Sequence, residues 1–262
     1  MARAERAENA EKKMPLGVHL REARKRFVIC LLAIAATSIA GFFAAPFVIH
    51  ELRAPLEQLA QDGRPVNLNY QVVTESFDIR MRIGFLLGIV AASPVWLYQI
   101  LRFFVPGLKH RERAYVFGFL GAAVPLFLGG CYLGWMLLPR ITSIFVGFGE
   151  VDLAAFLSAS SYFDFSSKLV LAIGVAFVLP VFVVILNFAG AMSGKTIMKG
   201  WRWAIIGVTL FTAFVTPAGD IMSMFVIAIP MWLIFFAAAG IALFNDWLRA
   251  RRERKREAEP AL

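Results

Sequence analysis

The chain has 262 residues, of which 59 % are hydrophobic and 25 are phenylalanine, and its formal net charge is +9. This apolar fraction exceeds that of a typical soluble domain, so the composition excludes a soluble globular protein and predicts an integral membrane protein. A basic excess in a soluble chain would suggest nucleic acid as a partner. Here the Lys and Arg residues lie in short loops and tails beside apolar runs, where anionic lipid headgroups are the expected partner.

Six uncharged runs are long enough to cross a bilayer, since a spanning helix needs about 20 predominantly apolar residues. They predict an all-α membrane protein whose six-helix domain covers residues 14–248, between a disordered tail (1–13) and a basic tail (249–262). The predicted spans are residues 27–49, 80–104, 114–139, 166–190, 201–217 and 221–245. The fifth is short for a hydrocarbon core of roughly 30 Å, so we expect a deeply set turn after it or local thinning of the bilayer.

The distribution of positive charge predicts the orientation of these spans. With both termini in the cytoplasm, the inner segments carry 21 of the 27 Lys and Arg residues. Positive charge near span ends favours the cytoplasmic side, so the sequence predicts that both termini lie inside. The inner segments are residues 1–26, 102–113, 195–202 and 249–256.

The segments on either side of the first span have distinct patterns. Leu16, Leu20, Ala23 and Phe27 recur at helical spacing before this span, which predicts a short amphipathic helix at the inner interface. After the span, the segment from Glu51 to Ser76 is rich in turn residues. It predicts a structured outer loop with one short helix.

Prolines inside the spans predict bent helices. Ser93 and Pro94 lie in the middle of the second span, and a proline there removes a backbone hydrogen bond and favours a kink. Three other spans contain Pro125, Pro180 and Pro230, so we expect a curved bundle of kinked helices. The third span also contains three small residues that predict close backbone packing. These are Gly129, Gly130 and Gly134.

The spans carry little that could perform chemistry. Their central parts contain no Asp, Glu, Lys, Arg or His, whereas ion and proton pathways normally need an ionisable group at membrane depth. Hydrolase and metalloprotease motifs are absent, as is the glycine-rich loop that binds ATP phosphates. Cys30 and Cys131 lie inside spans and are interpreted as small core residues. We therefore expect no enzyme, no cofactor and no metal site.

Two carboxylates lie in the otherwise basic inner segments, Glu22 in HLREARKR and Glu112 in PGLKHRER. On spacing alone, the simpler interpretation is local pairing of Glu22 with Arg26 and of Glu112 with Lys109 or neighbouring arginines, which contributes little stability at an exposed site. The alternative is that both carboxylates receive guanidinium groups from another molecule. Planar, bidentate pairing is the specific geometry for that contact.

At these residues the sequence resembles the TatC family, the multispanning subunit of the twin-arginine protein translocase. The resemblance begins at Val18, continues to the end of the sixth span, and rests on an ordered set of short motifs. The motifs are HLREARKR, Ala54-Pro55-Leu56, Ser93-Pro94-Val95 with Tyr98-Gln99, Phe103 with Pro106-Gly107-Leu108 and Glu112-Arg113, Tyr162-Phe163, Phe177 with Pro180, Thr216-Pro217 with Asp220, and Ala228-Ile229-Pro230-Met231.

The resemblance implies a receptor and core subunit that exports folded proteins across the bacterial cytoplasmic membrane, driven by the proton-motive force. The residues implied in binding twin-arginine signal peptides are Glu22, Arg24, Phe103 and Glu112. Those implied in structure and partner docking are Pro55, Pro94, Thr216, Pro217 and Asp220. The implied partners are TatA- and TatB-type single-span subunits, and we expect further copies of the chain in a homo-oligomer. The charge distribution adds anionic lipids as partners and no nucleic acid.

The chain departs from the family pattern at three positions. Val178 lies where many members carry a glutamate two residues before the proline of the fourth span, so no role of that glutamate is transferred. Ala23 replaces the usual leucine, and Ser76 replaces a common proline. These changes affect details of partner docking.

Two other classes of function stay open. A small-molecule permease or channel would need polar residues that converge inside the bundle, and an assembly factor without transport would share the fold. The loose candidates for a pore are Thr37, Ser38, Asn187, Thr209, Thr212 and Ser223. Hydrogen bonds to their own helices or contacts between helices explain these residues equally well.

Overall fold

The structure is a computed structural model that describes residues 16–61, 66–104, 113–147, 155–188, 192–215 and 221–258. Helices make up nearly all of these ranges. In chain order the elements are α2 (Leu16–Gln61), β1 (Val66–Asn69), α3 (Glu75–Ala91), α4 (Ser93–Phe104), α5 (Arg113–Gly147), β2 (Ala155–Ser158), α6 (Ala159–Phe188), α7 (Gly194–Lys199), α8 (Trp201–Val215) and α9 (Ile221–Ala258).

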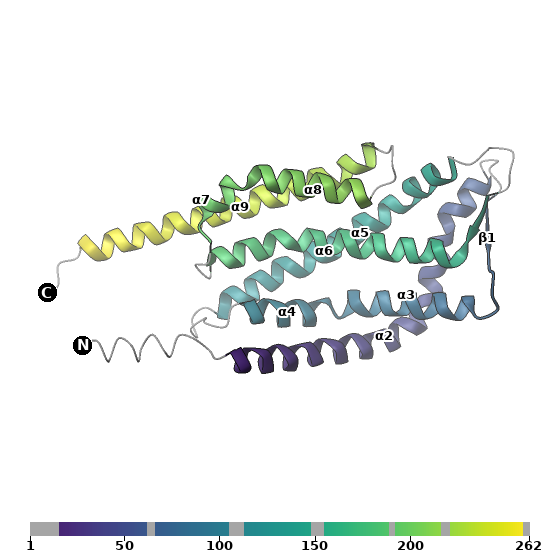
Figure 1. The fold of residues 1–262 in the computed structure, drawn as a ribbon, viewed down its shortest axis with the longest axis horizontal. Helices are drawn as coiled ribbons and strands as arrows, with labels where there is room; N and C mark the ends of the chain where they lie inside the picture. The colour runs from purple at the N-terminus through teal and green to yellow at the C-terminus, as the bar shows by residue number, and fades with distance from the viewer. Residues whose placement is uncertain are drawn as a thin grey trace.

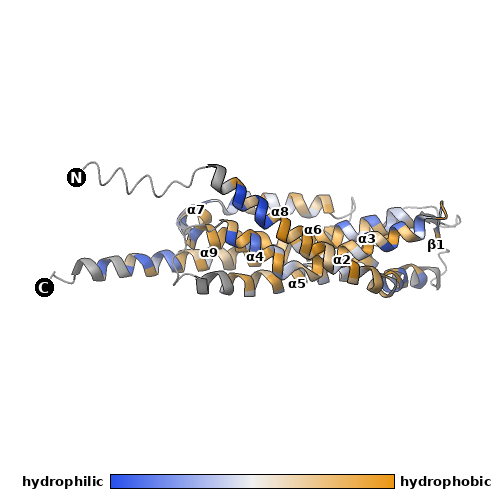
Figure 2. Cartoon of the chain, turned by 90° about the horizontal axis from the view of Figure 1, so that it is seen from below, coloured by the Kyte–Doolittle hydropathy of each residue, from blue (hydrophilic) through white to orange (hydrophobic). Residues whose placement is uncertain are grey.

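The helices form an elongated bundle with two distinct ends (Figure 1). The start of α2, the helix α7 and the end of α9 lie at one end, which we call the terminal end, and β1 lies at the other, the strand end. Apolar residues cover the middle of the bundle, whereas polar residues gather at the start of α2 and along the end of α9 (Figure 2). This is the distribution expected of helices that cross a membrane.

Within the described residues, four helical segments are long and apolar enough to cross a bilayer: Leu20–Ala54, Gly118–Ile144, Ala159–Phe188 and Met224–Arg251. The bent pair α3 and α4 makes a fifth if it counts as one span. The predicted fifth span corresponds to α8, an apolar helix of 15 residues. The turn after α8, residues 216–220, lies outside the described residues, and so its depth stays a prediction.

The first helix is longer than the sequence predicted. Instead of a separate amphipathic helix, a span and a loop, α2 is continuous over 46 residues. It passes through Pro46 and Pro55 in its second half, where it turns across the other helices toward the strand end (Figure 1). Leu52 and Leu56, one turn apart, are buried there, and the Tyr162 hydroxyl donates a hydrogen bond to the Leu52 carbonyl at 2.7 Å. This packing holds the segment helical despite its turn residues.

The predicted kink in the second span is confirmed. The chain breaks at Ala92, and the axes of α3 and α4 differ by 55°. The indole N–H of Trp96 donates to the carbonyl of Ile89 at 2.9 Å, so a side chain satisfies a backbone acceptor beside the break. α5, α6 and α9 continue as single helices through Pro125, Pro180 and Pro230, and the kinks expected at these prolines stay predictions.

Small residues set the closest helix contacts. A Cβ atom on Gly130 would lie 2.9 Å from the Cα of Gly174, and one on Gly134 would lie 3.0 Å from the Cα of Val170. The sequence predicted this close approach of the third span for Gly130 and Gly134, but it was wrong for Gly129, which has open space around it. At the α2–α3 contact, a Cβ on Gly84 would lie 2.8 Å from the Cα of Phe42.

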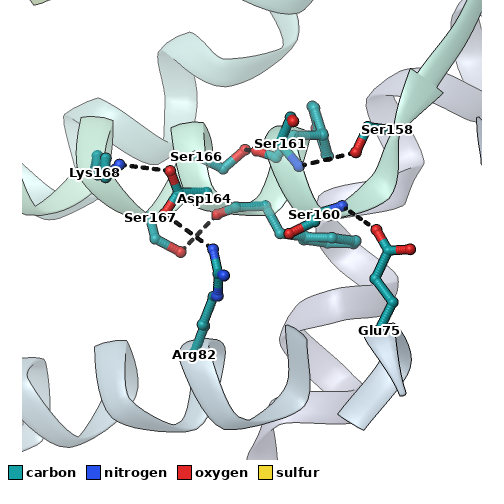
Figure 3. Close-up of polar contacts among 11 residues, drawn as sticks. Glu75, Arg82, Ser158, Ser160, Ser161, Asp164, Ser166, Ser167 and Lys168 are labelled. Carbon is teal, nitrogen blue, oxygen red and sulfur yellow. Dashed lines mark hydrogen bonds and ion pairs between the residues drawn. The ribbon is translucent and has the colours of Figure 1, made fainter. Parts of the chain in front are cut away.

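At the strand end, β1 and β2 form a parallel pair in which Val66 lies opposite Ala155 and Asn69 opposite Ser158. The buried carboxylate of Glu75 accepts hydrogen bonds from the backbone N–H groups of Gln71, Val72 and Ser160. It therefore joins the start of α3 to the start of α6 (Figure 3). Nearby, Asp164 accepts from Arg82 at 3.3 Å and from Lys168 at 2.6 Å (Figure 3).

Candidate functional site

The carboxylate of Glu22 lies near the start of α2, at the terminal end, and binds the guanidinium of Arg26 one turn later. Arg26 Nε donates to Glu22 Oε1 at 3.2 Å, and a second guanidinium nitrogen contacts the same oxygen. The local pairing expected from the spacing is thus confirmed. The Glu22 side chain keeps 31 % of its surface exposed, whereas Arg26 keeps 12 %. The pair is therefore accessible from the carboxylate side.

The same guanidinium connects α2 to α4. Arg26 Nη1 donates to Gln99 Oε1 at 3.5 Å, across 73 residues of sequence. Phe103 lies one turn after Gln99 on the same face of α4 and is half-buried. Through this contact the start of α2 and the end of α4 bring Glu22 and Phe103 to one region of the terminal end.

Arg24 occupies a different side of α2. Two residues along a helix correspond to a rotation of about 200°, so Arg24 lies almost opposite Glu22. Its side chain is exposed. The structure therefore does not place Arg24 in the contact between Glu22, Arg26 and Gln99.

The structure describes only some of the remaining residues singled out in the sequence. Glu112, Thr216, Pro217 and Asp220 lie outside the described residues. Pro55 lies within α2 rather than in an outer loop, because the helix continues to Gln61. Pro94 is the second residue of α4 and is exposed beside the break, and Val178 is buried in α6.

A profile of the family described as Sec-independent protein translocase protein (TatC) matches residues 18–230. The chain belongs to the TatC family. The Sec-independent protein translocase protein TatC of Rothia mucilaginosa is 40 % identical over 250 residues, which cover 94 % of this chain and 84 % of that protein. The TatC protein of Xylanimonas cellulosilytica is 37 % identical over 247 residues, which cover 94 % of this chain and 90 % of that protein.

The three-dimensional comparison agrees. A crystal structure of the twin-arginine translocase receptor TatC in DDM matches with a TM-score of 0.70 and 29 % identity, over 86 % of this chain and 99 % of that one. The resemblance deduced from the short motifs is therefore confirmed. As a TatC protein, the chain is a multi-pass membrane protein and a component of the twin-arginine, Sec-independent protein translocase.

Sequence reasoning missed a polar junction in this TatC fold, formed where α6, α7 and α9 meet. Asp246 accepts from Asn187 Nδ2 at 2.9 Å and from the backbone N–H of Gly194 at 2.6 Å. Asn245 Nδ2 donates to Asn187 Oδ1 at 2.9 Å. The signal in the sequence was Asn187 near the end of the fourth apolar run, together with Asn245 and Asp246 at the end of the sixth.

Three other candidates for a permease pore, Thr37, Thr209 and Thr212, form hydrogen bonds within and between helices. Thr37 Oγ1 donates to the carbonyls of Ala33 and Gly88, each at 2.8 Å, and so joins α2 to α3. Thr209 donates to Ile205, and Thr212 donates to Thr209, both within α8. These three hydroxyl groups therefore support the second interpretation that the sequence allowed, hydrogen bonds to helix backbones, over a pore lining.

Proposed function

We propose that the chain is the receptor and core subunit of the twin-arginine translocase and binds twin-arginine signal peptides at the cytoplasmic face. One observation carries the proposal: the Glu22 carboxylate, accessible at the terminal end, already holds a guanidinium in the Arg26 pair. A signal peptide presents the same chemical group, so it would exchange with Arg26 or share the carboxylate with it.

In the proposed site, Glu22 and Glu112 receive the consecutive arginines, and Phe103 contacts the apolar part of the signal. The α2–α4 contact through Arg26 and Gln99 supports a shared position of Glu22 and Phe103. Arg24 is proposed to shape the same site from its exposed position on α2. Charge pairing provides specificity, and burial of the apolar signal segment at about 0.8 kcal/mol per CH₂ provides much of the affinity.

The proposed topology has six spans, with α8 as the short fifth, and both termini in the cytoplasm of a bacterium. The common location of the start of α2 and the end of α9 supports an even number of crossings (Figure 1). The 21 Lys and Arg residues of the predicted inner segments support the direction. We accordingly propose that the chain lies in the bacterial cytoplasmic membrane.

We further propose that TatA- and TatB-type subunits and other copies of the chain assemble with it, and that the proton-motive force drives export. Thr216, Pro217 and Asp220 are the proposed docking turn, while Pro55 and Pro94 shape the helices that carry the site. α8 and α9, which pack against each other, flank that turn in the sequence and are the proposed contact for single-span partners.

Cross-linking of a twin-arginine signal peptide to the membrane-inserted chain tests the site. We expect Glu112→Ala to abolish the cross-link while membrane insertion stays normal, and Glu22→Ala with Glu112→Ala to abolish export. The exposed Glu57 on α2 provides the control, because Glu57→Ala removes one carboxylate elsewhere. Replacing the peptide's Arg-Arg by Lys-Lys should remove the cross-link as well. Unchanged export by the double variant would refute the proposed site.

A further inference from the structure

An open groove lies at the terminal end between α7, the start of α8 and α9, away from the Glu22 site. Its volume is about 810 Å³, and seven described residues line it. They are Lys195, Met198, Lys199, Trp201, Arg202, Phe236 and Leu243. The groove combines a basic rim with an apolar wall.

The rim carries three positive charges. Lys195 and Lys199 are one helical turn apart on α7, and Arg202 follows after the turn at Gly200. The Arg202 guanidinium lies 5.7 Å from the centre of the Trp201 ring. None of the described lining residues is acidic. Asp246, on the neighbouring stretch of α9, already accepts hydrogen bonds from Asn187 and Gly194.

The wall is apolar and follows α9 toward the middle of the bundle. Phe236 and Leu243 are seven residues apart, so they lie on one face of the helix, about 10 Å apart along its axis. Met198 extends this surface on α7. Trp201 is exposed at the mouth, and tryptophan prefers the membrane–water interface.

The groove is held in place before any ligand binds. A Cβ on Gly194 would lie 2.6 Å from the backbone nitrogen of Leu243, so the start of α7 rests directly on α9. Ser193 caps α7 by accepting from the Thr196 N–H at 3.2 Å. A ligand therefore meets α7 already in position, which lowers the entropy cost of binding.

From these features we infer that the groove binds one anionic phospholipid of the cytoplasmic leaflet. The phosphate lies among Lys195, Lys199 and Arg202, and one acyl chain lies along Phe236 and Leu243. Three cations without a lining carboxylate favour a headgroup with net negative charge, because a zwitterionic headgroup brings a cation of its own. The site goes beyond signal-peptide recognition and shares none of its residues.

Native mass spectrometry of the full-length chain in detergent tests the inference, with phosphatidylglycerol and phosphatidylcholine of identical acyl chains as probes. We expect one tightly bound phosphatidylglycerol and weaker phosphatidylcholine binding. The triple variant Lys195→Gln, Lys199→Gln and Arg202→Gln should weaken phosphatidylglycerol binding by about tenfold or more. The matched control removes three exposed charges elsewhere and should leave the first binding step unchanged. It is Arg21→Gln, Arg251→Gln and Arg254→Gln.

Three results would overturn the inference: equal binding of the two lipids, equal loss in both triple variants, or competition by glycerol phosphate as strong as by the intact lipid. The last would mean that the headgroup alone is recognised. Circular dichroism during heating checks that each variant folds. If the glutamine variant unfolds, a second triple variant keeps all three charges: Lys195→Arg, Lys199→Arg and Arg202→Lys. Loss of phosphatidylglycerol binding by this second variant would also contradict the inference.

Discussion

Individual small residues decide how closely the helices of this protein approach. A Cβ on Gly88 would meet the Cα of Ser38 at 2.8 Å, so the α2–α3 contact has no room for one methyl group. Gly121, on the third span, has open space around it. Sequence reasoning identified Gly130 and Gly134 but included Gly129 and omitted Gly88. Spacing alone does not tell which glycine faces a neighbour, because that depends on how the helix is rotated.

Gly88→Ala should destabilise the fold by about 1–3 kcal/mol, because the added methyl group overlaps Ser38 and separates α2 from α3. The matched variant Gly121→Ala should be neutral or slightly stabilising, since alanine favours helix over glycine and nothing obstructs it. Thermal unfolding of the full chain in detergent measures both. Equal effects of the two substitutions would contradict the packing argument.

Arg26→Gln removes the guanidinium that occupies Glu22. Under the proposed function, an incoming signal peptide then meets less competition, so its affinity should rise about two- to fivefold, the scale of a partly exposed ion pair. Fluorescence titration with a labelled twin-arginine peptide measures the change. Arg21→Gln removes the same charge from an exposed position on α2 and serves as the control. If the Arg26 variant binds the peptide more weakly and the Arg21 variant does not, Arg26 is itself part of the binding site.

At the scale of elements, a proline predicted the break in the second span, whereas turn residues did not predict the end of α2. Pro94 marks the 55° break between α3 and α4 because a proline in a helix directly removes a backbone hydrogen bond. The end of α2 was misplaced because Pro55 and its neighbours suggested a loop, whereas burial of Leu52 and Leu56 against distant residues stabilises the helix. Long-range packing of this kind leaves no local signal.

The Asp246 junction gives a prediction about α7. Asp246→Ala leaves the Gly194 N–H without its acceptor and the Asn187 amide with the Met192 carbonyl as its remaining acceptor, so we expect a loss of about 1–3 kcal/mol and faster backbone hydrogen exchange across residues 194–199. Hydrogen exchange with mass spectrometry measures this segment directly. Glu57→Ala, at an exposed position of α2, should leave the exchange of α7 unchanged. Unaltered exchange in the Asp246 variant would show that other contacts hold α7.

For the whole molecule, composition and apolar periodicity predicted the fold class, and each predicted span corresponds to a helix or a bent pair in the structure. The pairing of β1 with β2 and the contact from Arg26 to Gln99 were not predicted, since each joins residues far apart in the sequence. The candidate site was predictable in part. Glu22 was identified from its isolation among basic residues, but the role of Phe103 came from the family resemblance alone.

Single cysteines test the proposed topology in a variant whose Cys30 and Cys131 are replaced by alanine. Ser161→Cys at the strand end should react with a membrane-impermeant thiol reagent in intact cells, whereas Ser193→Cys should react only after lysis. Six spans also require Leu20→Cys and Arg251→Cys to be labelled from the same side. Labelling from opposite sides would mean that α8 does not cross the bilayer. Surface expression of each variant provides the control.

The break at Ala92 divides the second apolar segment into two helices with different sets of neighbours. α3 packs closely against α2 through glycine contacts. α4 is a separate helix of 12 residues beyond the break. α4 packs against both α2 and α5, with Leu97 and Leu101 buried, so a change of angle at Ala92 must rearrange these contacts but can leave the α2–α3 contact intact. The hydrogen bonds of Glu75 at the strand end would then keep their partners while the end of α4, with Phe103, shifts position.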